Sequence, residues 1–388
     1  MYSTISAVYR VTNAGLNPLQ LLLVGTVLEG TVLLCEIPTG LVADIYSRRL
    51  SIIIGVLLIG VGFLLEGLIP RFQTILLAQV LWGIGSTFTS GAENAWIADE
   101  VGETNVGSVY LRGSQTGQIG ALVGTFLSVG LASFQLNLPI IVGGNLFIGL
   151  GIFLLITMPE QGFIPTPQEK RNSWQAMGHT LRSGVQIVCQ KPVLITVLAI
   201  SALYGMASEG FDRLWEVHLW KNFTLPNLGQ FQPIVWFGII NAVAILLSIV
   251  AVEFVRRRVN MTSHVGAARA LFTINILLIA SLVTFGLAGN FVVAVVAYWA
   301  VYLLRAMNNP IYTAWLNQKL DPNVRATVFS ASSQFNALGQ IIGGPILGAI
   351  GKVMSIGAVM VGAGIVLSPV LLLYARILRR GNSQIDIQ

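Results

Sequence analysis

The chain has 388 residues, of which 54% are hydrophobic and only 10% carry a charge. Soluble proteins carry roughly 25% charged residues, so this composition excludes an ordinary soluble domain and predicts a protein that spans a membrane. The net charge of +6 does not indicate a nucleic-acid partner, because the sequence offers no basic face with interleaved aromatic residues on a soluble element.

The first predicted element, Met1 to Thr12, is apolar but too short to cross a bilayer, which takes about 20 helical residues. We expect it to be the outer half of a first spanning helix whose beginning is missing from this sequence. A signal peptide is not expected, because a basic start and a small-residue cleavage site are lacking. Eleven full spans are predicted after it, at about residues 19–43, 50–70, 74–98, 108–133, 136–157, 192–212, 232–254, 270–288, 290–314, 326–350 and 354–377.

A short polar turn separates the first two of these full spans. Gly40 should let a neighbouring helix approach closely, and Asp44 can accept hydrogen bonds from the free amides at the start of the next helix. Arg48 and Arg49 should hold the turn in the cytoplasm. Most of the 22 basic residues fall on that same side, which also places the C-terminus in the cytoplasm.

The turn resembles the loop 2-3 signature of the major facilitator superfamily, Gly-x-x-x-Asp-Arg-x-Gly-Arg-Arg. Gly40, Asp44, Arg48 and Arg49 fit this signature, whereas Ile45 replaces a usual basic residue and Ser47 replaces a usual glycine. The resemblance implies an all-α fold of two six-helix bundles around a central cavity, here with an incomplete first helix. It also implies a bracing role for Asp44 against Arg112 or the start of the eleventh span near Arg325.

Three internal echoes support a duplication of six-helix halves, as expected for parallel repeats. Ala95-Trp96-Ile97 is repeated as Ala314-Trp315-Leu316, and Asp44 with Arg48-Arg49 is repeated as Glu253 with Arg257-Arg258. Arg112 and Arg325 each open the next span. The predicted domains are residues 1–157 as the N-terminal bundle, 158–191 as a cytoplasmic linker, and 192–388 as the C-terminal bundle with a short tail.

The linker carries apolar residues at helical spacing, namely Trp174, Met177, Leu181, Val185 and Val188. This pattern predicts an amphipathic helix on the inner leaflet, and a solvated linker helix is the alternative. Glycines are concentrated in the fifth span and the eleventh, where they should allow close helix crossings. The fifth span lacks the proline of the motif that marks drug/proton antiporters in this superfamily.

Charged groups within spans are costly and usually face a cavity or a partner. Glu29 is the deepest acid and is a candidate for proton coupling, with a hydrogen bond to a neighbouring helix as the structural alternative. Glu36 is assigned a structural or gating role. Arg305 can hold an anionic substrate group, balance a titrating glutamate or form a fixed interhelical bridge. Asn309 beside it should weaken the helix at a cavity.

Glu209, Asp212 and Arg213 cluster at the outer end of the seventh span and are candidates for an outer gate. Local pairing of Glu209 with Arg213 at i,i+4 is the alternative. The sequence shows no phosphate-binding glycine loop, no metal-ligand spacing among its three histidines and no visible nucleophile triad. We therefore expect no enzyme activity, no cofactor and no metal.

The sequence is most similar to bacterial multidrug and tetracycline-type efflux proteins, on the turn from Asp44 to Arg49, on Arg325 to Val328 and on the scattered intramembrane acids. This resemblance implies a monomeric antiporter of the inner membrane that exports amphipathic small molecules against proton entry. A proton-coupled importer of a small metabolite is the alternative, and it would need a compact ring of charged and polar groups. A non-transporting membrane receptor or assembly partner is the third hypothesis.

Overall fold

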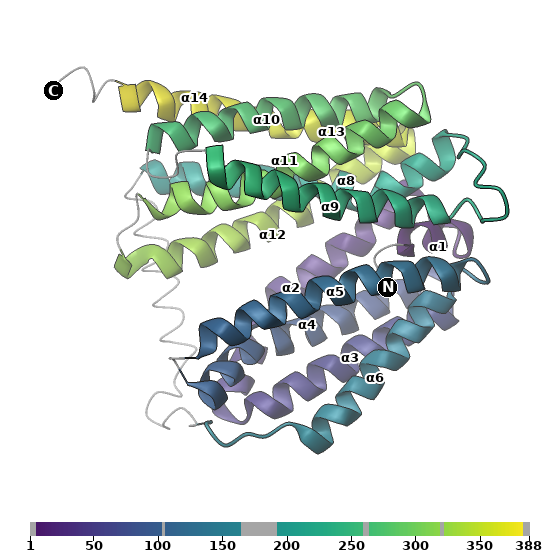
Figure 1. The fold of residues 1–388 in the computed structure, drawn as a ribbon, viewed down its shortest axis with the longest axis vertical. Coiled ribbons are helices and arrows are strands. Elements are labelled where there is room, and N and C mark those ends of the chain that lie inside the picture. Colours follow the sequence, from purple (N-terminus) through teal and green to yellow (C-terminus); the bar gives the residue numbers. More distant parts are fainter. Residues whose placement is uncertain (1–4, 103–104, 164–191, 259–263, 319–321, 383–388) are drawn as a thin grey trace. The chain divides into compact units, whose positions relative to one another are not determined.

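The computed structural model describes residues 5–102, 105–163, 192–258, 264–318 and 322–382, and all of its regular elements there are helices. The helices are labelled in Figure 1. They are α1 (Ser6–Thr12), α2 (Pro18–Ile45), α3 (Arg48–Leu68), α4 (Phe72–Val101), α5 (Val106–Ala132), α6 (Leu138–Thr157), α8 (Pro192–Asn222), α9 (Val235–Arg258), α10 (His264–Leu287), α11 (Phe291–Asn317), α12 (Pro322–Val353), α13 (Ile356–Leu367) and α14 (Pro369–Asn382).

The prediction of an all-α membrane protein is confirmed. Nine helical stretches of the described chain are long and apolar enough to cross a membrane. Each of the eleven predicted full spans is helical, and the last one is divided into α13 and α14 at Ser368. α5 and α12 are not among the nine, because polar residues interrupt their apolar character. The predicted amphipathic linker helix falls outside the described residues.

The helices form two compact units, apart from short stretches of α2 and α9 that are assigned across the division. The first unit holds α1 to α6, and the second holds α8 to α14. The predicted boundaries at residues 157 and 192 stay a prediction, because the chain between residues 164 and 191 is not described.

In the first unit α3 packs between α4 and α6. Phe63 of α3 contacts Trp82 of α4 and Phe147 of α6 edge-on, with ring centroids 5.3 and 5.5 Å apart. Gly55 and Gly85 lie at the crossing of α3 and α4, where a Cβ on either residue would collide with the carbonyl oxygen of the other. Aromatic contacts and a close glycine crossing therefore fix this three-helix core.

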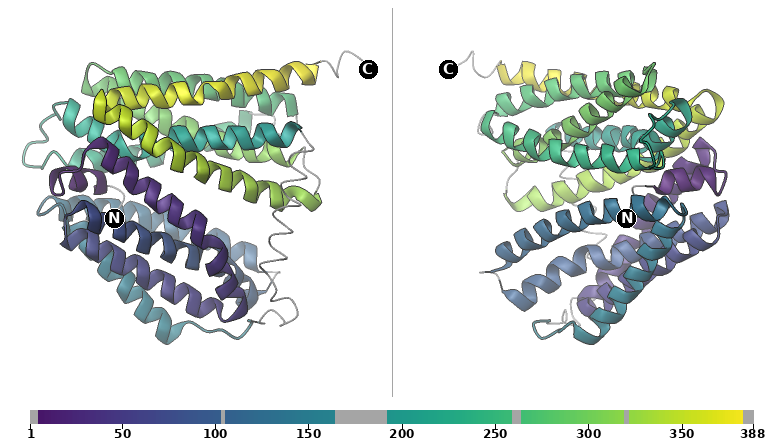
Figure 2. Two further views of the ribbon diagram at one scale, coloured as in Figure 1. Left: turned by 180° about the vertical axis from the view of Figure 1, so that it is seen from behind. Right: turned by 45° about the vertical axis from the view of Figure 1, so that its right-hand side comes forward.

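In the second unit α12 packs on α8, and α10 packs on α11, α13 and α14 (Figures 1 and 2). The close crossing expected at the eleventh span is present here. A Cβ on Gly339 or Gly343 of α12 would overlap the backbone of Ala202 or Met206 on α8. The same is not true of the fifth span, since a Cβ on Gly113, Gly117 or Gly120 would meet no atom within 4 Å.

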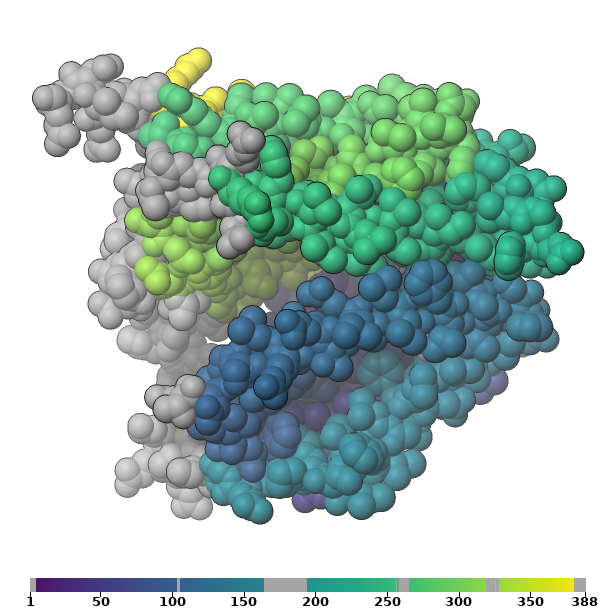
Figure 3. All heavy atoms as spheres, in the orientation of Figure 1, coloured from purple at the N-terminus to yellow at the C-terminus, as the bar shows by residue number. Residues whose placement is uncertain are grey.

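Large apolar side chains also cover outward faces of the helices, as lipid contact requires. α9 exposes Leu246, Ile249, Val250 and Phe254, and its surface can be followed in the space-filling view (Figure 3). α5 and α6 expose a similar set, which includes Phe126 of α5. In water such a surface would promote aggregation, whereas in a bilayer it matches the acyl chains.

Candidate functional site

A polar cavity lies inside the second unit, between α8, α11 and α12. Its volume is ≈ 260 Å³, a little below the roughly 300–1,000 Å³ that is typical of ligand pockets. Its lining residues are Tyr204, Ser208, Asp212, Arg305, Asn308, Asn309, Asn336 and Gln340. A site of this size and lining suits one small, hydrophilic molecule.

Helical spacing brings these polar side chains to one place. Tyr204, Ser208 and Asp212 follow one another at i,i+4 along α8, so they share one face of that helix. Asn336 and Gln340 have the same spacing on α12. α11 contributes Arg305, Asn308 and Asn309, which come just before Pro310. This proline lies inside the helix and lacks the amide that would normally bond the carbonyl four residues earlier.

An ion pair forms the charged centre of the cavity. Arg305 donates from Nη1 to Asp212 Oδ1 at 2.5 Å and from Nη2 to Asp212 Oδ2 at 2.9 Å. The side chains of Arg305 and Asp212 remain 35% and 42% exposed, because they face the open space of the cavity. The guanidinium also lies 5.8 Å from the centre of the Phe211 ring. A bidentate fork of this kind is the geometry with which arginine recognises a carboxylate.

Hydrogen bonds hold the amides of the cavity wall in defined orientations. Asn336 Nδ2 donates to the Ser201 carbonyl at 3.1 Å, and Gln340 Nε2 donates to Asn336 Oδ1 at 2.8 Å. Tyr204 donates its hydroxyl proton to Asn275, whose own amide group reaches Asn308 at 3.4 Å. The site is therefore preorganised before any ligand binds.

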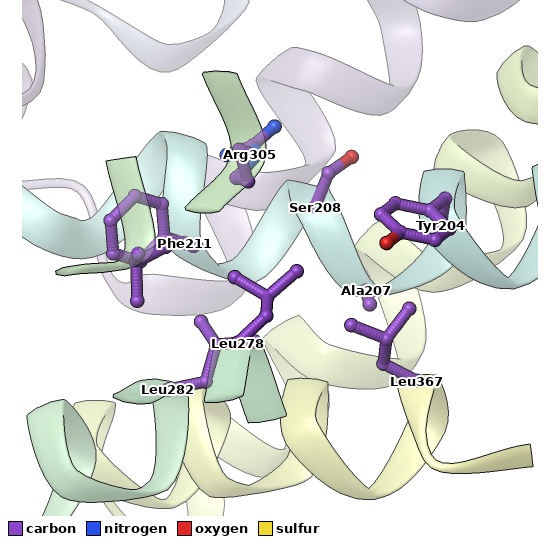
Figure 4. Close-up of a pocket in the computed structure, with 9 residues that line it drawn as sticks. Tyr204, Ala207, Ser208, Phe211, Leu278, Leu282, Arg305 and Leu367 are labelled. Carbon is purple, nitrogen blue, oxygen red and sulfur yellow. The ribbon is translucent and has the colours of Figure 1, made fainter. Parts of the chain in front are cut away.

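A small apolar pocket adjoins the polar cavity and shares Tyr204, Ser208 and Arg305 with it (Figure 4). Its volume is only ≈ 20 Å³, which is little more than one water molecule needs. The remaining walls are apolar and are formed by Ala207, Phe211, Leu278, Leu282, Val301 and Leu367. The second unit thus offers a charged site with a short hydrophobic recess beside it.

The predicted site residues are only partly brought together. Arg305 and Asn309 line the cavity as expected, but Asp212, which we assigned to an outer gate, lines the same cavity and pairs with Arg305. Glu209 and Arg213, which we grouped with Asp212, do not line this cavity. Arg213 Nε donates to Glu209 Oε2 at 3.3 Å, and Glu209 is buried. The local i,i+4 pairing of Glu209 and Arg213 is therefore observed.

The two acids predicted for proton coupling or gating lie on α2 in the first unit. Glu29 is half-buried in the first half of the helix, and Glu36 is exposed near Pro38. Their predicted roles stay predictions.

A second polar network surrounds the turn between α2 and α3. Arg48 forms an ion pair with Asp99 near the end of α4 and donates to the Ala95 carbonyl at 3.1 Å. Asp44 lies farther away, at 3.8 Å from Arg48 Nη2. Arg48 therefore ties the turn to α4 mainly through Asp99, an acid that the sequence pattern did not single out.

The first amides of α3 have different acceptors from those we expected. Leu50 N donates to Ser47 Oγ at 2.9 Å, and Arg49 N donates to Glu160 Oε1 at 2.9 Å. Ser47 is the residue that replaces the usual glycine of the signature, and here it caps the helix. These two amides are therefore bonded by Glu160 and Ser47, and the role of Asp44 as an acceptor stays a prediction.

The other residues proposed for a conformational switch are more loosely placed. A Cβ on Gly40 would meet no atom within 4 Å, so the close packing expected there is not observed. Arg112 is exposed on α5. Arg325, near the start of α12, donates to the Asn317 carbonyl at 3.4 Å. Their roles in a switch stay predictions.

The Asp99→Asn substitution should lower the turnover of the protein more than its ligand affinity. It removes the charge that fixes Arg48 to α4, and a partly exposed ion pair contributes about 1 kcal/mol, which is about a fivefold change in a conformational equilibrium. Asp44→Asn should have the smaller effect, since Asp44 is 59% exposed and lies farther from Arg48. Initial rates and binding constants of the two variants test this order, and an equal loss of affinity in both would contradict it.

Sequence reasoning missed most of the uncharged residues of the cavity. The exception is Asn309, because a polar residue beside a proline and an intramembrane arginine is conspicuous. Tyr204, Ser208, Asn336 and Gln340 carry a weaker signal, which is a polar stripe at i,i+4 within an apolar span. Among the described residues no cluster of histidine, cysteine or acidic side chains could hold a metal ion.

Comparison with known proteins agrees with this architecture. The sequence profile of the Major Facilitator Superfamily matches residues 1–344. The uncharacterized MFS-type transporter YxaM of Bacillus subtilis (strain 168) is 21% identical over 372 residues, which cover 95% of this chain and 90% of that protein.

Two solved structures have the same fold. The nucleoside transporter NupG superposes with a TM-score of 0.75 at 15% identity, over 97% of this chain and 94% of that one. A POT family transporter in complex with a thioalcohol-conjugated peptide superposes with a TM-score of 0.74 at 14% identity, over 98% and 93% of the two chains. At these identities the likeness shows the fold alone.

Proposed function

This chain belongs to the Major Facilitator Superfamily, and we propose that it is a secondary active transporter that imports a small polar metabolite with protons. The cavity of the second unit is the observation that carries the proposal. It gathers a charge pair, four amides and two hydroxyl groups in ≈ 260 Å³. An importer of small metabolites needs such a compact polar ring, since every polar group of the substrate must find a partner away from water.

Transport itself would follow alternating access, in which the two helix bundles rock about the bound substrate. The ion pair of Arg305 and Asp212 in the cavity is the group that we propose to respond to the proton. We place the protein in the cytoplasmic membrane, with the turn between α2 and α3 and the C-terminus on the inner side, from the distribution of basic residues.

Proton-coupled export of amphipathic molecules is the second candidate. The apolar pocket beside Arg305 supports it, because an amphipathic substrate could place its polar part on the ion pair and an apolar group between Phe211 and Leu282. The small volume of that pocket, ≈ 20 Å³, favours substrates with only a short apolar group. Bulky dyes and drugs would require the helices to separate.

Purified protein in sealed liposomes separates the two candidates. Counterflow of labelled small solutes across a panel of sugars, nucleosides, amino acids and organic acids needs no gradient, so it tests carriage alone. We expect at least one polar solute to exchange, and to accumulate when the interior is made alkaline. Exchange of amphipathic dyes without exchange of any polar solute would favour the export hypothesis over the import hypothesis. Protein-free liposomes provide the background rate.

A further inference from the structure

We propose that the substrate is a small organic anion with a short apolar group, and that Asp212 takes up the coupling proton. This inference rests on the proposed transport function and names its substrate class. It follows from the charges that line the cavity, from their geometry and from the size of the adjoining pocket. Lactate is a molecule of this class that can be used as a probe.

Arg305 supplies the group that binds the anion. Among the lining residues of the cavity Arg305 is the single cation and Asp212 the single anion, and the rest are neutral amides and hydroxyls. The fork of Arg305 is already set for a carboxylate, with two bonds of 2.5 and 2.9 Å to Asp212. A substrate carboxylate can take the place of the Asp212 carboxylate on the same two donors.

Asp212 supplies the group that takes up the proton. When Asp212 is protonated it no longer holds Arg305 as an ion pair, and the freed guanidinium attracts an anion. The anion binds to Arg305, and neighbouring amide groups such as those of Asn308 and Asn309 can bond its remaining lone pairs. After the site opens to the other side, the anion leaves, Asp212 releases its proton to water and the ion pair forms again.

Charge balance makes the coupling obligatory. Among the described residues of the second unit that line the cavity, one is positive and one is negative. The loaded form has Arg305, a neutral Asp212 and one anion, so this set of groups is neutral both before and after loading. A cavity with only the proton would gain a positive charge, and a cavity with only the anion would gain a negative one. Because a net charge inside the membrane is costly, the two half-loaded forms reorient far less often. The predicted cycle carries one proton with each anion and moves no net charge.

Several charged and polar groups lie around Asp212. Arg305 is the charged partner in direct contact, and on α8 itself Glu209 and Arg213 bond each other at 3.3 Å. Glu216 follows Asp212 at i,i+4 on α8, and Tyr298 of α11 lies within electrostatic range of both acids. The described residues of α11 and α12 that line the cavity beside Arg305 are the neutral amides Asn308, Asn309, Asn336 and Gln340. Val359 of α13 lies against Gly210 of α8, and Tyr374 of α14 lies near Tyr204 and Tyr312.

The apolar pocket limits the size of the substrate. Leu278, Leu282, Leu367 and Ala207 line a space of ≈ 20 Å³. Their side chains are labelled in Figure 4. That space accepts a methyl-sized group next to the carboxylate site. The Ala207→Leu substitution should fill it, and Leu282→Ala should enlarge it, so these two positions set the chain length that the site accepts.

Binding measurements in detergent test the inference without any transport. The purified protein is titrated with lactate and with lactamide, which has the same shape and no charge, in buffers that differ in ionisation enthalpy. We expect lactate to bind with uptake of about one proton and lactamide to bind at least tenfold more weakly. Because lactate binding is coupled to proton uptake, the lactate affinity should fall as the pH rises.

Three variants sharpen this test. Asp212→Asn should bind lactate without proton uptake and independently of pH, at least tenfold more tightly than the unmodified protein at pH 8. Asp212→Glu should restore proton uptake, and Glu29→Gln should keep it. Leu282→Ala should improve binding of 2-hydroxyhexanoate relative to lactate, and Ala207→Leu should weaken both.

Equal binding of lactate and lactamide, or proton uptake that survives in Asp212→Asn and disappears in Glu29→Gln, would overturn the inference. Transport of a neutral or cationic solute in the liposome assay would overturn the substrate class and leave the transport function intact. Failure of the liposomes to carry any solute would instead reject the proposed function. The same liposomes with a clamped membrane potential should accumulate lactate in response to a pH gradient alone, and accumulation driven by potential alone would contradict the neutral cycle.

Discussion

The Arg10→Met substitution should lower the free energy of unfolding by about 3–5 kcal/mol, because it leaves a buried carboxylate without its counter-charge. Arg10 of α1 and Glu66 of α3 have side chains that are 3% and 0% exposed. Two bonds join them, from Arg10 Nε to Glu66 Oε1 at 2.9 Å and from Arg10 Nη2 to Glu66 Oε2 at 3.2 Å. Gln79 of α4 donates to the same carboxylate at 3.0 Å, so three helices meet at this pair.

A double variant distinguishes a broken pair from a lost side chain. Arg10→Met with Glu66→Gln removes both charges, and Gln79 keeps an acceptor of the same shape. Since the desolvation of a buried ion pair offsets much of its attraction, we expect the double variant to recover most of the lost stability. Arg71→Met is the matched control, because Arg71 is an exposed arginine just before α4. Unfolding in detergent measures these proteins together with the single variant Glu66→Gln, and additive losses in the double variant would show that the two charges do not interact.

This pair also shows where sequence reasoning ends. The positions of the spans were predictable, because the length of each apolar run decides them. The backbone groups within a spanning helix bond one another and need no partner from another helix. The partners of charged groups were not predictable in the same way. Arg10 and Glu66 are 56 residues apart in the sequence, yet they are buried together. Only the packing of α1 on α3 brings them into contact.

In the candidate site, too, the partner of a charged group was not predictable from the sequence. The need of Arg305 for an acidic or carbonyl partner was predictable, but the sequence does not say which helix faces α11. Glu29 and Asp212 were both available, and Asp212 was assigned to a gate because its charged cluster lies at the outer end of the seventh predicted span. The structure pairs it with Arg305, 93 residues away. The turn at residues 40–49 was located correctly, whereas the role of Ser47 as a cap depended on the position of α3.

Arg305→Met should abolish accumulation of the substrate and reduce its affinity about 10- to 150-fold, the range that follows from about 1.5–3 kcal/mol for hydrogen bonds to a charged group. It also leaves the Asp212 carboxylate in the cavity without a cation. Arg305→Lys keeps the charge but offers one ammonium group in place of a planar fork, so an intermediate loss is expected. Binding titrations and liposome uptake measure both effects.

The neutral double variant Asp212→Asn with Arg305→Gln separates recognition from folding. We expect it to unfold at a temperature close to that of the unmodified protein, since no unpaired charge remains, and yet to accumulate no substrate. Arg257→Met is the matched control: this arginine is 72% exposed and bonds Glu253 at i,i+4 in the same unit, so its loss should leave uptake within about twofold, as expected for a surface pair. Normal uptake by the double variant would show that the ion pair only holds α8 and α11 together, and substrate recognition would then have to lie outside this cavity.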